Sequence, residues 1–115
     1  MKEQITDNLD FISGKRLVQE LFRYLEEEET FYQKAFEIQG QNNFYTDFID
    51  YCQLIVEKIL KEYPTHPSIV TDQTFLSFHK NYQALALAET IKQVVQGQIP
   101  KPHPDYILAE ITGLK

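Results

Sequence analysis

Residues 44–62 carry apolar side chains every three or four positions, which makes them the most strongly patterned segment of the chain. The apolar positions are Phe44, Phe48, Tyr51, Cys52, Ile55, Ile59 and Leu60. An α-helix has about 3.6 residues per turn, so side chains at this spacing lie on one face of a helix. The pattern therefore predicts a long amphipathic helix that buries one side.

Glycine and proline divide the rest of the chain into further helical segments. The glycines stand at positions 14, 40, 97 and 113, and two prolines interrupt residues 63–67. Asn42 or Asn43, and Thr71 or Asp72, are suitable N-caps for the segments that follow them. Helices are predicted over an N-terminal segment with Ile5, Leu9 and Ile12, and over residues 15–29, 30–39, 44–62, 72–96 and 104–112. No strand is predicted, so the fold class is all-α, a helical bundle of five to six helices.

The composition is that of one folded domain. The chain has 115 residues, of which 43% are hydrophobic, and this excludes a disordered segment. No stretch reaches the ~20 apolar residues of a membrane span, so no membrane contact is expected. The single cysteine cannot form an internal disulfide, which favours a cytoplasmic location. The net charge of −6 argues against nucleic-acid binding by this chain alone.

The negative charge is concentrated in the first half of the chain. Residues 1–62 hold 13 acidic and 7 basic residues, whereas residues 63–115 hold four of each. The acidic half includes four consecutive glutamates, Glu26 to Glu29. Adjacent carboxylates on a helix spread around its axis, so no metal site is predicted there. The run is interpreted as a solvated helix face, with a partner-facing acidic patch as the alternative.

One segment departs from the amphipathic pattern. Ala84-Leu85-Ala86-Leu87-Ala88 is apolar at five consecutive positions, which covers every direction around a helix axis. A helix that is apolar all round is normally buried on more than one side. Two interpretations fit the segment: it packs between its own domain and a second copy of the chain, or it is the central helix of a monomer.

The residues that most often carry catalysis are dispersed along the chain. His66 and His103 lie in proline-rich segments and are expected to be solvated, whereas His79 is expected in the core or in a pocket. No histidine pair has the spacing of metal ligands, and the sequence has no glycine-rich loop for a phosphate group. Cys52 lies on an apolar face and is interpreted as a small buried hydrophobic residue. We therefore expect no enzyme activity, no metal and no cofactor.

Aromatic residues are unusually frequent, with 8 Phe and 7 Tyr but no Trp. They either fill the core or partly line a cavity between the helices predicted over residues 30–39, 44–62 and 72–96. Pockets between bundle helices are mainly apolar with a few polar groups, and tyrosine supplies both. The candidate pocket residues are Tyr32, Phe36, Phe48, Tyr51, Cys52, Phe75, His79 and Tyr82.

Three motifs in this order resemble a known family. Tyr24-Leu25 is followed by Glu28-Glu29-Thr30-Phe31-Tyr32, then comes Gly40-Gln41-Asn42-Asn43-Phe44, and the long helix 72–96 is closed by Gly97 and a proline-rich link. Together they resemble the C-terminal domain of TetR-family transcriptional regulators. The second motif is similar to a link in the branch related to activators of dihydroxyacetone kinase operons. The family often has a tryptophan near the end of the long helix, where this chain has Val94.

The resemblance covers residues 14–112 and implies a domain organisation. Residues 1–13 would be the end of a linker helix, continued through Asp7-Asn8-Leu9-Asp10, and residues 14–115 a regulatory and dimerisation domain. The helix-turn-helix domain that contacts DNA in this family is absent from the chain, which indicates either a truncated chain or a natural stand-alone remnant. The input would be a small-molecule effector or a signalling partner protein.

The resemblance also implies a homodimer in which helices 72–96 and 103–112 of two copies form a four-helix bundle. The candidate interface residues are Leu85, Ala88, Ile91, Val95, Ile107 and Ile111. The alternative function is a helical protein–protein interaction module with a filled interior, whose partner recognises the acidic first half. An enzyme would require at least two titratable residues that face each other inside a pocket.

Overall fold

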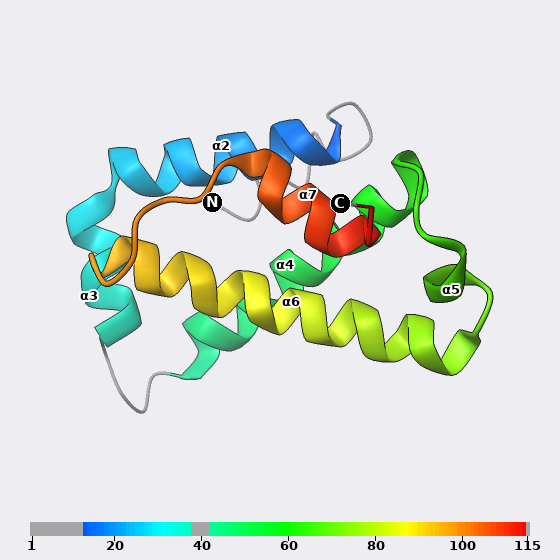
Figure 1. The fold of residues 1–115 in the computed structure, drawn as a ribbon. Helices are drawn as coiled ribbons and strands as arrows, with labels where there is room; N and C mark the ends of the chain where they lie inside the picture. Colours follow the sequence, from blue (N-terminus) through cyan, green and yellow to red (C-terminus); the bar gives the residue numbers. More distant parts are fainter. Residues whose placement is uncertain (1–12, 38–41, 115) are drawn as a thin grey trace.

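The computed structural model describes residues 13–37 and 42–114, and over these residues the chain forms α-helices and no β-strand. The helices are α2 (Gly14–Glu27), α3 (Glu29–Glu37), α4 (Asn42–Glu62), α5 (Pro67–Val70), α6 (Gln73–Val95) and α7 (Pro104–Thr112). Figure 1 shows α6 crossing in front of α4, with α2 and α7 above them and α3 and α5 at opposite ends. The predicted all-α bundle is confirmed.

Local capping sets the boundaries of α6 and α7. The carboxylate of Asp72 accepts hydrogen bonds from the backbone N–H groups of Thr74 and Phe75, at 3.0 and 3.2 Å, directly before α6 begins. Pro104 occupies the first turn of α7 and Gly113 ends it with a φ of 72°, a left-handed conformation that glycine adopts without strain. The predicted starts of these two helices are confirmed.

The short helix α5 differs from prediction. Residues 63–67 are predicted only as a break, yet α5 begins at Pro67, because a proline at the first helical position lacks only an N–H that would have no helical partner. The ring nitrogen Nδ1 of His66 accepts a hydrogen bond from the N–H of Ser68 at 3.2 Å and caps the turn. The helix packs against α6.

Some predicted features lie outside the described residues. They are the N-terminal helix with Ile5, Leu9 and Ile12, the link around Gly40, and residues 1–12 of the proposed linker helix. They stay predictions.

The core is built from the apolar faces of α2, α4 and α6, with α3 and α7 at its edges. Its most deeply buried residues are Leu17, Val18, Leu21, Leu25, Phe48, Tyr51, Cys52, Ile55, Val56, Ile59, Ala84, Ala88, Ile91 and Ile111. The first residue of α2, Gly14, lies so close to α4 that a Cβ there would collide with the side chain of Ile59. The approach of α2 to α4 at this point therefore depends on a glycine.

Polar contacts fix α7 against the rest of the bundle. Lys15 on α2 forms a salt bridge with Asp105 on α7, with an N–O distance of 3.0 Å. At the other end of α7, the buried His79 of α6 donates through Nε2 to the carbonyl oxygen of Ile111 at 2.7 Å, since a carbonyl oxygen only accepts. The position of α7 is thus set from both α2 and α6.

Candidate functional site

Aromatic rings from α3 and α4 form a packed cluster at one end of the core. The ring centroids of Phe36 and Phe44 are 5.1 Å apart, and those of Phe36 and Phe48 are 5.5 Å apart, both in edge-to-face contact. Tyr32 lies 6.0 Å from Phe44. These distances are typical of favourable aromatic pairs. Three of the predicted pocket residues, Tyr32, Phe36 and Phe48, are thus brought together here, in one packed cluster.

Two more predicted pocket residues lie deeper, on the inner face of α4. Tyr51 and Cys52 are 1% and 0% exposed, and burial raises the pKa of both side chains above their ordinary range. The Tyr51 hydroxyl has no hydrogen-bond partner among the described residues. A buried polar group without a partner costs about 1–3 kcal/mol relative to a satisfied one. The core therefore contains one polar group that a water molecule or a polar ligand atom would satisfy.

The other three predicted pocket residues do not join this group. His79 is buried, but it bonds the end of α7. Phe75 and Tyr82 are 39% and 57% exposed on the outer side of α6. Each residue of a helix advances by about 100°, so Phe75 lies half a turn away from the inward-facing Ala84. The three-to-four spacing of Phe75, His79 and Tyr82 identifies a shared side of the helix but not the side that faces the core.

The outer side of α6 carries a stripe of exposed apolar side chains. We call this the outer stripe; its members are Phe75, Phe78, Tyr82 and Leu85. The rings of Phe78 and Tyr82 stack with centroids 5.6 Å apart, and Phe75 lies 6.4 Å from Phe78. Contiguous exposed apolar side chains are a feature of interaction surfaces, so the outer stripe is a candidate for one.

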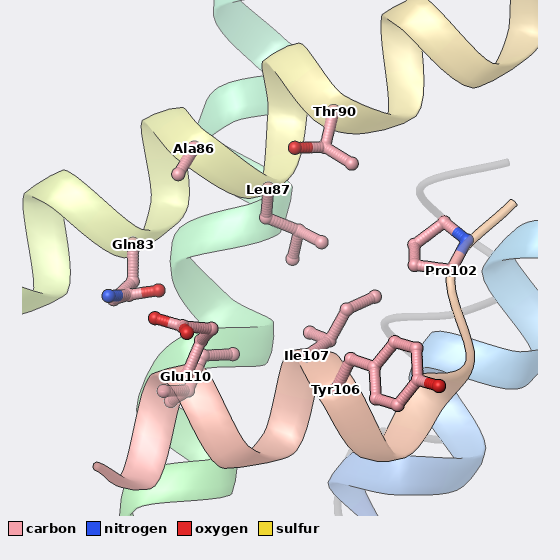
Figure 2. Close-up of a pocket in the computed structure, with 9 residues that line it drawn as sticks. Gln83, Ala86, Leu87, Thr90, Pro102, Tyr106, Ile107 and Glu110 are labelled. Atoms are coloured by element: carbon pink, nitrogen blue, oxygen red, sulfur yellow. The ribbon is translucent and has the colours of Figure 1, made fainter. Parts of the chain in front are cut away.

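A groove between α6 and α7 borders the outer stripe. It has a volume of about 200 Å³ and is lined by Gln83, Ala86, Leu87, Thr90, Pro102, Tyr106, Ile107, Glu110 and Ile111. Figure 2 shows Leu87 and Thr90 of α6 pointing toward Ile107 of α7, with Tyr106 and Pro102 at one end. None of the eight predicted pocket residues lines this groove. Sequence reasoning missed the groove, because it forms only where α7 packs beside α6.

The six predicted interface residues are divided between the core and the surface. Ala88, Ile91, Val95 and Ile111 are buried within the chain itself, at 0–7% exposed, so they contact their own helices. Leu85 is 42% exposed, and Ile107 is partly buried and lines the groove. Only Leu85 and Ile107 are therefore placed where a second copy has access to them in this conformation.

The five-residue apolar segment shows the same division. Ala84, Leu87 and Ala88 face the core, while Leu85 and Ala86 are exposed. One flank is thus covered by the chain's own helices and the other is exposed to solvent.

The acidic run is solvent-exposed. Glu26 pairs with Lys101 at 2.8 Å and Glu27 with Arg23 at 2.6 Å, and all four glutamates are exposed. Exposed pairs of this kind stabilise a fold by less than about 1 kcal/mol each. Within residues 13–37 and 42–114, no three His, Cys, Asp or Glu side chains are grouped as a metal site requires.

The fold and these surfaces define a small α-helical domain with an aromatic core and an open apolar face on its longest helix. A family model described as a transcriptional regulator C-terminal region, of the TetR type, matches residues 15–113. The chain therefore belongs to the family of C-terminal regions of TetR-type transcriptional regulators. The comparisons with curated proteins and with solved structures gave no match. No helix of the described residues has the length and hydropathy needed to span a bilayer.

Proposed function

We propose that this chain is the effector-sensing and dimerisation domain of a TetR-type regulator in the branch of the dihydroxyacetone kinase operon activators. In this proposal it works in the cytoplasm as a homodimer and catalyses no reaction. A helix-turn-helix domain outside residues 14–115 contacts DNA, and residues 1–13 belong to the helix that leads to it.

The exposed outer stripe supports dimerisation. Phe78 and Tyr82 are 60% and 57% exposed, so a large aromatic surface remains in water when the chain is alone. Burying apolar surface contributes roughly 25 cal/mol per Å², and two copies related by a two-fold axis bury the same patch twice. The stripe lies on α6, beside the groove formed with α7, which are the helices of the proposed four-helix bundle.

The Tyr51 hydroxyl is the single observation that carries the effector part of the proposal. It is a buried polar group without a partner among the described residues, surrounded by an aromatic and aliphatic core. A ligand that suits it is a mainly apolar small molecule with one hydrogen-bonding group. Such a ligand would displace part of the aromatic packing and bond to Tyr51.

The inner face of α4 connects that position to the N-terminal end of the domain. Tyr51, Ile55 and Ile59 follow one another at four-residue intervals, so they lie on one side of the helix. Ile59 contacts Gly14, the first residue of α2, and the N–H of Gly14 donates to Glu62 at 3.0 Å. An effector that prefers one position of α4 shifts the population of helix arrangements and moves the start of α2. This movement is the signal transmitted to the DNA-binding domain.

A ligand screen tests the effector part. Thermal unfolding is followed with a panel of apolar molecules that carry one carbonyl or hydroxyl group, and a binder raises the Tm. Tyr51→Phe is expected to remove that shift, whereas Tyr63→Phe, at the partly buried position just after α4, is expected to retain it. A binder whose Tm shift is the same in both variants would exclude Tyr51 as its partner.

Light scattering tests the dimer part. The expected mass at tens of micromolar is about twice the 13.6 kDa of one chain. A clean monomer at that concentration would refute dimerisation by this domain, even if a ligand is found.

The alternative is a protein–protein interaction module without a ligand. The packed contacts of Phe36 with Phe44 and Phe48, and the exposed run Glu26 to Glu29, favour it. It predicts that no small molecule changes the Tm and that a basic partner protein binds in a salt-dependent manner.

A further inference from the structure

The exposed side of α6 has a mirrored distribution of side-chain size. The large residues are Phe75, Phe78 and Tyr82, which are exposed, and the smaller or polar residues are the exposed Ala86 and the partly buried Thr90 and Gln93. The intervals are three and then four residues in the first set, and four and then three in the second. The two sets are therefore mirror images about the level of Ala84, the residue midway between Tyr82 and Ala86.

This arrangement is self-complementary under a two-fold axis. When two identical helices run antiparallel and cross at the level of Ala84, Tyr82 of one copy lies opposite Ala86 of the other, and Phe78 lies opposite Thr90. Both of these contacts pair a large ring with a small side chain, which lets the ridges of one helix fit into the grooves of the other. A parallel pairing would place Tyr82 against Tyr82 and leave the small positions facing each other.

The groove supplies the space for these rings. Ala86 and Thr90 form part of its α6 wall, and Leu87 and Ile107 give it an apolar floor. Its volume of about 200 Å³ is of the size of an aromatic side chain. Gln83 also lines it and offers a polar partner for a tyrosine hydroxyl.

We propose that the aromatic rings of the outer stripe of one copy occupy the α6–α7 groove of a second copy, with the two α6 helices antiparallel about the level of Ala84. We assign the groove to a second copy because the rings and the small positions that would receive them lie on the same helix in mirrored order. A groove for a different protein or a small ligand would not need this order. The inference rests on the proposed dimer and assigns its register. Each copy contributes the rings that complete the other copy's groove.

A charge exchange between two variants tests this register. Tyr82→Lys alone replaces the ring with an ammonium group in a mainly apolar groove, which Gln83 and Glu110 also line. Ala86→Glu alone places a carboxylate against a ring. Each is expected to raise the dimer Kd by about thirtyfold or more, as loss of an interface hot spot does. An equimolar mixture is expected to form a 1:1 heterodimer. One of its two contacts then pairs the introduced ammonium group with the introduced carboxylate, and the other keeps the native pair of Tyr82 and Ala86.

Matched controls separate the register from a general effect of charge. Ser77 is exposed on α6 but lies away from the outer stripe, so Ser77→Lys and Ser77→Glu are expected to leave the dimer Kd unchanged. Circular dichroism establishes that all variants retain their helices. If the wild type is a dimer but the mixture does not associate, or the single variants dimerise normally, the register is wrong and the proposed dimer still stands. If the wild type is a monomer, both are wrong.

Disulfide trapping gives a second measurement that does not depend on charge. A mixture of Tyr82→Cys and Ala86→Cys chains, distinguished by a mass tag, is expected to cross-link mainly as the mixed pair under mild oxidation. The native Cys52 is 0% exposed and does not compete. Predominant cross-linking of Tyr82→Cys chains to each other would overturn the antiparallel register.

Discussion

The two long helices, α4 and α6, differ in what they present to water. Most of the exposed side chains described on α4 are polar, and Leu54 is the exception among them. The polar ones are Thr46, Asp47, Asp50, Lys61 and Glu62. The exposed positions of α6 include the outer stripe and Ala86, so much of its surface is apolar. Both helices bury an apolar face in the same core. The difference is that the outer face of α4 is mainly polar, whereas α6 leaves an apolar face exposed, and this is the face proposed for dimerisation.

The largest expected effect comes from the inner face of α4. Ile55 is fully buried, so Ile55→Ala is expected to lower the free energy of unfolding by about 2–5 kcal/mol through lost burial and a cavity. Leu54, the preceding residue, is 36% exposed, and Leu54→Ala is expected to cost less than about 1 kcal/mol. Urea denaturation measures both. Equal losses at the two positions would show that α4 does not have the inner and outer faces described.

A smaller loss is expected where α4 meets α2. Gly14→Ala introduces a methyl group that collides with the side chain of Ile59, and overpacking of this kind costs about 1–3 kcal/mol. Ile59→Ala removes the colliding atoms, so the double variant should lose less stability than the sum of the two single losses. Strict additivity would mean that the two helices do not touch at this point.

The sequence predicted the helices well because their signals are local. Asp72 caps α6 and Pro104 opens α7 through contacts with residues two or three positions away. The inner face of α4 was also predicted. Its opposite face is polar, so only the apolar face can turn toward the core. Local pattern was sufficient wherever one side of a helix is clearly polar.

The candidate site was harder to predict because α6 is apolar on two sides. Spacing alone assigned Phe75 and Tyr82 to a pocket and Ala88 to an interface, whereas the structure buries Ala88 and exposes the two rings. The groove depends on how α7 lies against α6, which is fixed by long-range contacts such as that of His79 with Ile111. Such contacts leave no periodic signal in the sequence.

The hydrogen bond between Tyr45 of α4 and Glu89 of α6 should affect the titration of Tyr45 at high pH. Burial, and then a hydrogen bond of 2.9 Å to Glu89 of α6, raise the pKa of Tyr45 to about 12. A pKa that is higher in the folded state means that this contribution to stability is present below pH ~10 and is lost as the pH rises toward 12. Phenolate absorbance should therefore show a tyrosine that titrates near pH 12, and the free energy of unfolding measured with urea should fall as the pH rises from about 10 toward that value.

Removing the carboxylate of Glu89 isolates the contribution of α6 to the raised pKa of Tyr45. Glu89→Gln is expected to lower the pKa of Tyr45 while leaving that of Tyr32 raised, since burial is the main cause at Tyr32 and Glu89 is not among its neighbouring charges. If the pKa of Tyr45 is the same in Glu89→Gln as in the wild type, the hydrogen bond between Tyr45 and Glu89 does not form in solution.

The smallest expected effect distinguishes two tyrosines on α4 itself. Tyr45→Phe removes a hydrogen bond to α6 and is expected to cost about 0.5–1.5 kcal/mol of unfolding free energy. Tyr51→Phe removes a buried hydroxyl that has no partner among the described residues, so it should leave stability unchanged or raise it by up to about 1 kcal/mol. The same change from Tyr to Phe is thus expected to destabilise the domain at Tyr45, which bonds α6, but not at Tyr51, which is proposed to bond a ligand. Destabilisation by Tyr51→Phe without added ligand would mean that the hydroxyl is already satisfied by bound water, and an effector would then have to displace that water to gain affinity.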